Sequence, residues 1–164
     1  MSMYVIQVAT GQEKTIRDAL LDKCIPAYVP EENRWIRSGG TWKQKNYVAF
    51  RSYVFLIVRD VRRSYYDVKR IPDVYRWLEL HTGRATPLLE GEEAMIREMC
   101  GDEPMDSVVA QDGKTLIPVS GLLRTYYDRG STIVYDLHAR RAIVGNPLTL
   151  LPNHVLTLSF RLLK

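Results

Sequence analysis

The segment Tyr53-Val-Phe-Leu-Ile-Val58 constrains the fold of this 164-residue chain more than any other. It is apolar or aromatic throughout and lacks the alternation of a half-exposed strand. Such a strand is covered on both faces, which requires layers of structure on either side of its sheet. We therefore expect residues 53–58 to form the central strand of a mixed α+β domain.

The segments before this strand predict a strand, a helix and a hairpin. Residues 3–8 are apolar and β-prone, and Thr10 and Glu13 have the spacing of a capping box at a helix start. Residues 27–29 predict a short strand, and Ser38-Gly-Gly40 predicts a hairpin tip. The helix that follows Glu13 has one apolar face, which we expect in the core and which contains Ile16, Ala19, Leu20 and Cys24.

The segments after it predict two more helices around one strand. Asp60 is placed to cap a helix that ends before Pro72, and residues 74–80 read as a strand. Pro87 precedes a third helix over residues 90–99, whose acidic first turn suits the helix dipole. The order β-α-β-β-α-β-α over residues 1–100 predicts an α+β sandwich with an antiparallel sheet and helices.

The rest of the chain has a different pattern. Residues 101–114 are polar and rich in turn formers, and we expect a linker there. Residues 115–164 show no helical period. Their short apolar runs, separated by turn residues, predict a small all-β barrel. These runs are residues 115–119, 131–135, 141–144, 148–151 and 155–160.

Charge is arranged in blocks that the formal net charge of +4 conceals. Residues 34–76 hold eleven Lys or Arg and three acids, or +8, with aromatic residues between them. Residues 79–112 sum to 2 − 9 = −7, and residues 129–164 sum to 5 − 1 = +4. A basic block with aromatics is typical of a phosphate-binding surface, and the alternative is a solvated surface.

Motifs for catalysis, cofactors and metals are missing from the sequence. His81, His138 and His154 are scattered, and neither Cys24 nor Cys100 has the spacing of a metal ligand. No nucleophile elbow, phosphate loop or dinucleotide fingerprint occurs. We therefore expect no enzyme activity, no cofactor and no metal. We also expect no membrane span, a cytoplasmic location, free thiols and a monomer.

The first hundred residues resemble the NusG family of transcription elongation factors. Tyr4-Val-Ile-Gln-Val-Ala-Thr-Gly-Gln-Glu13 looks like the opening strand, turn and Glu of the family, and Phe50-Arg-Ser-Tyr-Val-Phe55 resembles its Phe-Pro-Gly-Tyr-Val-Phe signature. Lys69-Arg-Ile-Pro-Asp-Val74 with Trp77-Leu78, and the proline-led segment 85–96, follow in the family's order. Arg51-Ser52 in place of Pro-Gly, and Met3 in place of a frequent Trp, suggest a specialised paralog.

The C-terminal part resembles a divergent KOW domain, the small barrel that usually follows in this family. Residues 130–144 have its order of Gly, strand, basic turn and strand. The Gly-rich loop that normally precedes them is poor here, and Gly121-Leu-Leu-Arg124 is the nearest candidate. The resemblance thus implies an N-terminal NGN domain over residues 1–100, the linker over 101–114, and a KOW-like barrel over 115–164.

The resemblance also implies partners and contact residues. In the family the N-terminal domain docks on the clamp helices of RNA polymerase and favours a processive complex. The matching positions are Phe50 and Tyr53, then Met3 and Trp77, with core packing as the alternative. The barrel binds a ribosomal protein, a termination factor or RNA in different family members.

Specialised paralogs of the family also contact DNA or RNA. The positions that match DNA contacts are Gln12, Lys14, Lys69 and Arg70. The basic hairpin, with Trp35 and Trp42, is a second candidate surface through Arg34, Arg37, Lys43 and Lys45. Its alternative is a soluble, variable insertion. Arg140 and Arg141 lie on the expected barrel turn.

The sequence alone is compatible with two functions. The first is a bacterial elongation or antitermination factor that docks on RNA polymerase and is recruited by a DNA or RNA element. The second is an RNA- or single-stranded-DNA-binding regulatory module that acts without polymerase docking.

Overall fold

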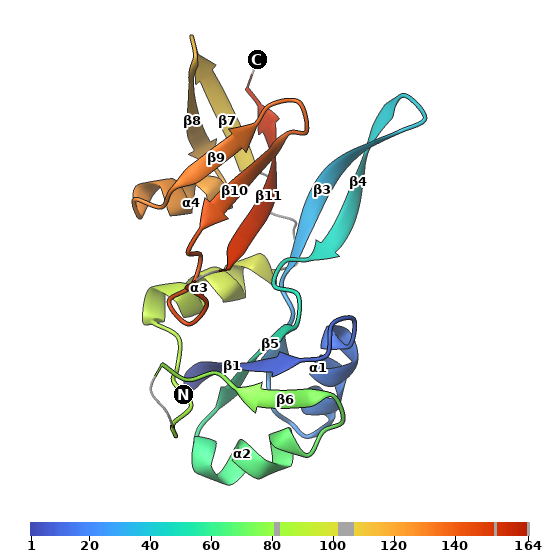
Figure 1. Cartoon of the computed structure of the whole chain (residues 1–164), viewed down its shortest axis with the longest axis vertical. Coiled ribbons are helices and arrows are strands. Elements are labelled where there is room, and N and C mark those ends of the chain that lie inside the picture. The colour runs from blue at the N-terminus through green and yellow to red at the C-terminus, as the bar shows by residue number, and fades with distance from the viewer. Residues whose placement is uncertain (81–82, 102–106, 153, 164) are drawn as a thin grey trace. The chain divides into compact units, whose positions relative to one another are not determined.

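The computed structural model describes residues 1–80, 83–101, 107–152 and 154–163, and it divides into two domains (Figure 1). The first domain comprises Met1–Pro30 and Phe50–Cys100, and the second comprises Glu31–Ala49 and Gly101–Lys164. The hairpin segment, which the sequence pattern assigned to the N-terminal 100 residues, therefore belongs to the second domain.

The first domain is built on a four-stranded antiparallel sheet in the order β2-β5-β1-β6. Its strands are β1 (Ser2–Val8), β2 (Ala27–Tyr28), β5 (Tyr53–Val58) and β6 (Val74–Trp77). The central position of β5 is confirmed: β1 and β2 flank it, and all its residues except Tyr53 are buried. Alternation along β5 places Tyr53, Phe55 and Ile57 on one face of the sheet.

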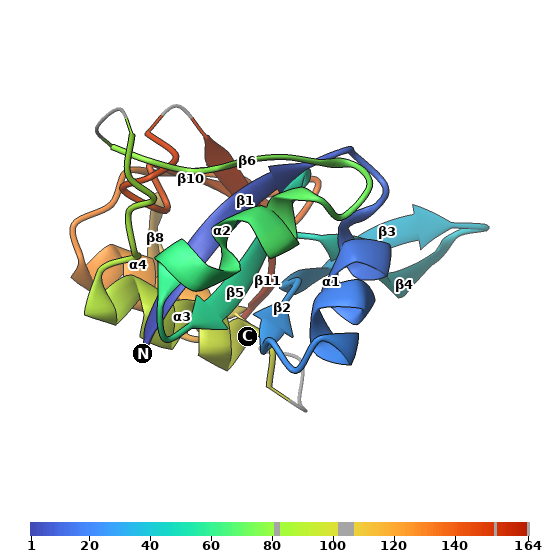
Figure 2. The same cartoon turned by 90° about the horizontal axis from the view of Figure 1, so that it is seen from below.

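Three helices cover this sheet. They are α1 (Glu13–Asp22), α2 (Val61–Lys69) and α3 (Glu90–Met99). Asp60 caps α2 as predicted, since its carboxylate accepts a hydrogen bond from the Arg62 amide at 3.0 Å. Trp77 stacks on Tyr65 of α2, with ring centroids 5.8 Å apart. Figures 1 and 2 show α2 and α3 on opposite sides of the sheet, which explains why β5 is apolar on both faces.

Several predictions for the first domain were wrong in detail. The N-cap of α1 is Gln12 rather than Thr10, because the Glu13 side chain turns back to the Gly11 amide. Cys24 is exposed, since α1 ends at Asp22 and Cys24 adopts a left-handed conformation with φ of 60°. The strand expected over residues 74–80 ends at Trp77. His81 lies outside the described residues.

The second domain contains a five-stranded sheet in the order β8-β7-β11-β10-β9. Its strands are β7 (Ser107–Asp112), β8 (Thr115–Ser120), β9 (Ile133–Asp136), β10 (Arg141–Gly145) and β11 (Val155–Leu162). All neighbouring pairs are antiparallel except β11 and β7. This curled half-barrel after an α+β domain confirms the predicted fold class.

Three features of the second domain differ from the sequence predictions. β7 occupies six residues of the expected linker, and its Ser107 and Val109 are buried. Residues 122–128 form helix α4 (Leu122–Asp128), although no helical period was detected there. The helix has only seven residues, so its buried Leu122, Leu123 and Tyr126 are too few to reveal a period. Residues 148–151 form a turn rather than a strand.

The hairpin consists of β3 (Glu31–Ser38) and β4 (Thr41–Val48). The predicted tip is confirmed: Ser38 pairs with Thr41 around Gly39 and Gly40, whose φ values of 59° and 81° favour glycine. β3 lies beside β11, and the Trp35 amide donates to the Ser159 hydroxyl at 3.2 Å. The hairpin is thus tied to the half-barrel of its own domain. Among the described residues, no helix is long and apolar enough to cross a membrane.

Candidate functional site

The residues expected to dock on polymerase differ sharply in exposure. Met3, Phe50 and Trp77 are 0%, 0% and 2% exposed, whereas Tyr53 is half-buried. Phe50 meets Phe55 edge to face at 5.4 Å, and the Trp77 indole donates to the Tyr65 carbonyl at 3.2 Å. Three of the four side chains therefore pack in the core, and Tyr53 alone combines the resemblance with an accessible surface.

A network of backbone hydrogen bonds holds the turn that carries Tyr53. The buried Glu13 carboxylate accepts from the Gly11 amide at 3.0 Å and from the Ser52 amide at 2.9 Å. Ser52 adopts a φ of 74°, the conformation that a glycine favours. The Thr10 and Ser52 hydroxyls are also hydrogen bonded. Glu13 thus joins the start of α1 to the turn before β5.

The four nucleic-acid candidates of the first domain are exposed near two adjacent turns. Gln12 and Lys14 lie at the start of α1, and Lys69 and Arg70 at the end of α2. The Ala9 amide donates to the Asp73 carbonyl at 2.9 Å, which joins the turns that carry the two pairs.

The first domain also carries exposed aromatic residues. Tyr66 and Tyr75, which sequence reasoning did not select, are 66% and 57% exposed in the same domain. Their exposure, visible only in the structure, is the signal that marks them as possible stacking surfaces for bases.

The hairpin divides its basic residues between two faces. Cross-strand pairing places Arg34, Lys43 and Lys45 on one face and Arg37 on the other. On the first face, the Arg34 guanidinium lies 4.5 Å from the Tyr47 ring centroid and the Lys45 ammonium 5.5 Å from it. These cations therefore stack on an aromatic ring, which positions their charges.

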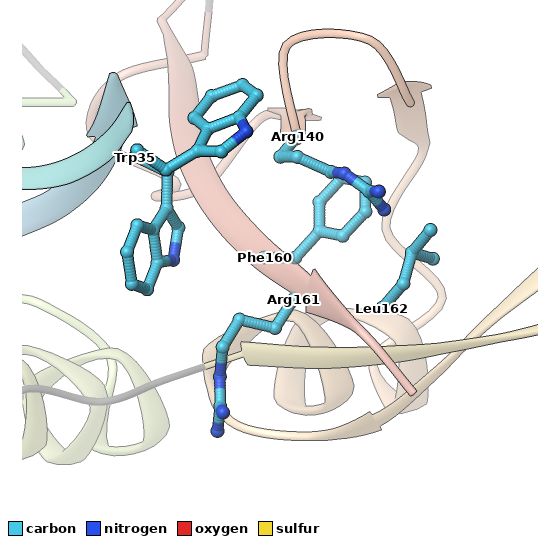
Figure 3. Close-up of a pocket in the computed structure, with 6 residues that line it drawn as sticks. Trp35, Arg140, Phe160, Arg161 and Leu162 are labelled. Carbon is cyan, nitrogen blue, oxygen red and sulfur yellow. The ribbon is translucent and has the colours of Figure 1, made fainter. Parts of the chain in front are cut away.

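The second face of the hairpin brings Trp35 and Trp42 together beside the half-barrel. One cavity of about 320 Å³ next to them is completed by Arg140, Phe160, Arg161 and Leu162. Figure 3 shows indole rings on one side of it and Arg140, Phe160 and Leu162 on the other. A second cavity of about 310 Å³ shares both tryptophans and is completed by Ile36, Arg37, His138, Ala139 and Arg141. We call the two cavities the tryptophan cavities.

A buried carboxylate fixes the hairpin base near β10. Glu32 is 5% exposed, forms an ion pair with Arg34 and lies within the electrostatic reach of Arg141. Burial raises the pKa of Glu32 above its ordinary value of 4.5, and the two arginines oppose that rise. Glu32 is thus paired within the hairpin and lies near the strand that begins at Arg141.

Of the two arginines expected on the basic turn, Arg140 lies in the turn before β10, whereas Arg141 is the first residue of β10. Arg140 Nη1 and Arg141 Nε are buried and make no hydrogen bond to the described part of the chain. Arg140 also has a φ of 55°. Sequence reasoning missed Phe160 and Arg161, because an alternating strand gives no sign of what packs beside it.

Comparisons with known proteins agree with this architecture. The model of the NusG family, described as transcription termination factor nusG, matches residues 1–97. A solved structure of NusG from Thermotoga maritima, titled as a study of domain interaction, matches with a TM-score of 0.56 and 17% identity. That match covers 96% of this chain and 93% of the other. A search of curated proteins found no match.

The fold is therefore that of a two-domain NusG-type protein, with an NGN-like domain followed by a KOW-like half-barrel. The chain belongs to the NusG family, because the family model covers more than half of it. Members of this family are transcription factors rather than enzymes, and they generally bind RNA polymerase. The resemblance stated from the sequence is confirmed at the level of the family.

Proposed function

We propose that this protein is a bacterial transcription elongation and antitermination factor that docks on the clamp helices of RNA polymerase and promotes processivity. The observation that supports this best is the family match, which spans nearly all of the first domain. The docking surface is proposed around Tyr53, since a half-buried tyrosine suits a contact that is apolar at the ring and wet at the hydroxyl.

Met3, Phe50 and Trp77 support this surface from below rather than touch the partner. Because these three side chains are buried, they hold strands β1, β5 and β6 in place. Phe50 packs against Phe55, which lies on the same sheet face as Tyr53. Polymerase docking is therefore expected to depend on Tyr53 directly and on the three buried residues through the fold.

Nucleic-acid contacts are proposed to recruit the factor to its target. In the first domain they comprise Gln12, Lys14, Lys69 and Arg70. In the second domain they comprise the hairpin residues Arg34, Arg37, Lys43 and Lys45, with Arg140 and Arg141 on the barrel turn. The half-barrel is also the proposed binding site for a ribosomal protein or a termination factor. Phosphate contacts are supported by the exposure of Lys14, Lys69 and Arg70 on the first domain and of Arg37, Lys43 and Lys45 on the hairpin.

Pull-down of the full chain by the isolated polymerase clamp helices tests docking. Tyr53→Asp should abolish capture, because it puts a charge into an apolar contact. Tyr66→Asp is the matched control, since Tyr66 is an exposed tyrosine on α2. Urea unfolding curves should first show that both variants are folded in the absence of urea. Capture of Tyr53→Asp at the wild-type level would refute Tyr53 as the anchor. In vitro transcription through a terminator, with and without the protein, then tests antitermination.

The second candidate function is a regulatory module that binds RNA or single-stranded DNA and acts without the polymerase. The aromatic residues among the hairpin cations favour it. Nucleic-acid binding that persists together with no capture by clamp helices would favour this candidate. A steep fall of affinity with salt would support phosphate contacts, and a flat titration would count against them.

A further inference from the structure

We propose that the tryptophan cavities hold two consecutive unpaired nucleotides of a single-stranded nucleic acid. This inference rests on the nucleic-acid contacts proposed above and specifies their ligand, and it does not require polymerase docking. It assigns one composite site, built from the hairpin and the half-barrel, to a ligand that combines flat bases with phosphates.

The bases would stack on the indoles. Trp35 and Trp42 line both cavities, so their rings form the wall that the cavities share. Trp42 is 44% exposed, an unusual state for so large an apolar ring. Each base has a π-face, and stacking on an aromatic side chain is the usual way in which proteins hold unpaired bases. Cavities of about 320 and 310 Å³ fall in the size range of small-ligand sites.

The phosphates would be held by arginines on both sides of the indoles. Arg140 and Arg161 line one cavity, and Arg37 and Arg141 line the other. Among the described residues that line either cavity there is no Asp or Glu. Glu32 lies near Arg141 and offsets part of its charge. The remaining charge is still positive, so the lining is complementary to a polyanion.

Two of the arginines that line the cavities each have one buried nitrogen atom without a hydrogen bond to the described chain. Arg140 Nη1 and Arg141 Nε make no hydrogen bond to the described residues. Buried donors without partners are rare, because their desolvation is not offset. Arg140 is also held at a φ of 55°, a strained conformation for a side chain that ends at a cavity. Because both atoms are closed to solvent, a phosphate would bind the other nitrogen atoms of these two guanidinium groups.

The geometry favours a single strand over a duplex. In a duplex the bases are stacked on one another and present only their edges, whereas an indole in a cavity needs an open base face. The exposed cations of the opposite hairpin face, which include Lys43 and Lys45, suit phosphates of either form. Those lysines therefore provide a control for binding by charge alone.

The test is fluorescence anisotropy of the full chain with fluorescein-labelled U8 RNA, dT8 DNA and an 8-base-pair duplex. The proposal expects tighter binding of at least one single strand than of the duplex. Trp42→Ala should weaken single-strand binding by about 5- to 150-fold, which corresponds to the loss of one stacked base, and Trp42→Phe should retain part of the affinity. The stronger of the RNA and DNA arms identifies the strand that is bound.

Arg140→Gly provides a variant that keeps the fold, because glycine adopts the φ of residue 140 without strain. It should weaken binding and reduce the slope of log affinity against log salt by about 0.7, the value for one phosphate on a single strand. Lys43→Ala, on the other hairpin face, should leave the preference for a single strand unchanged.

Three outcomes would overturn the proposal: equal affinity for single strand and duplex, wild-type binding by both Trp42→Ala and Arg140→Gly, or a loss in Lys43→Ala as large as in Trp42→Ala. Tyr53→Asp should bind the single strand as the wild type does. Failure of this site is therefore distinguishable from failure of polymerase docking.

Discussion

Replacement of Glu13 by alanine should destabilise the first domain far more than its position at a helix start suggests. Glu13 is 4% exposed, and its carboxylate accepts from the Gly11 amide at 3.0 Å and from the Ser52 amide at 2.9 Å. The second bond crosses from α1 to the turn before β5. The variant would leave two backbone donors without their carboxylate partner, one of them in the turn that carries Tyr53.

The magnitude follows from the number of bonds to a charged acceptor. Each such bond contributes about 1.5–3 kcal/mol, so the loss of two should cost about 3 kcal/mol or more. A carboxylate in the first turn of a helix contributes only about 0.5 kcal/mol through the helix dipole. Glu90 provides the matched control, because it is the exposed first residue of α3. Glu90→Ala should therefore cost about 0.5 kcal/mol.

The assay is urea unfolding followed by tryptophan fluorescence. The chain has three tryptophans, so a Trp35→Phe and Trp42→Phe background leaves buried Trp77 as the reporter of the first domain. In that background Glu13→Ala should lower the free energy of unfolding in the urea titration by about 3 kcal/mol or more. In a thermal scan followed by the same fluorescence, the melting temperature should fall by about 12 °C or more, given about 4–8 °C per kcal/mol for a domain of this size. A loss no larger than that of Glu90→Ala would refute the bridging role of Glu13.

Three further predictions concern single residues. Ser52→Gly should be more stable than Ser52→Ala by about 1 kcal/mol in the same urea assay, because both lose the hydroxyl but only glycine relaxes at a φ of 74°. Asp60→Ala should cost about 1 kcal/mol through loss of the cap of α2, and Asp60→Asn should retain most of the stability. For Glu32 the raised pKa means that the folded state binds the proton more tightly than the unfolded chain. Wild-type stability should therefore fall as pH rises from 4.5 through the folded pKa, and Glu32→Gln should lack that slope in urea titrations from pH 4 to 8.

The elements with long, regular patterns were predictable from the sequence. The apolar run of β5, the Asp60 cap and the glycine tip of the hairpin each have a local cause that survives in the structure. The short α4 was not predictable, because seven residues give too few buried positions to define a period. Cys24 was misplaced for a related reason, since the helical spacing extends past the point where α1 ends.

The basic block of residues 34–76 could be recognised in the sequence, but its division between the two domains could not. Four of its cations belong to the hairpin of the second domain, and the other seven belong to the first domain. The sequence order places β3 and β4 between strands of the first domain. In the structure β3 contacts β11, which lies about 120 residues later in the chain. A local sequence pattern cannot predict such a long-range contact.

The tryptophan cavities show why the candidate site required the structure. In the sequence, Trp35 and Trp42 are two aromatic residues within a charged segment. A solvent-exposed hairpin was enough to explain that pattern. Cross-strand register places both on one face. The residues that come to that face from about 100 residues away are Arg140 in the turn before β10, Arg141 at the start of β10, and Phe160 and Arg161 of β11. A solvated insertion has no reason to place two indoles on the same face, or to set that face against the arginines of the half-barrel. Both features have a physical reason if the hairpin and the half-barrel together form a surface for unpaired nucleotides.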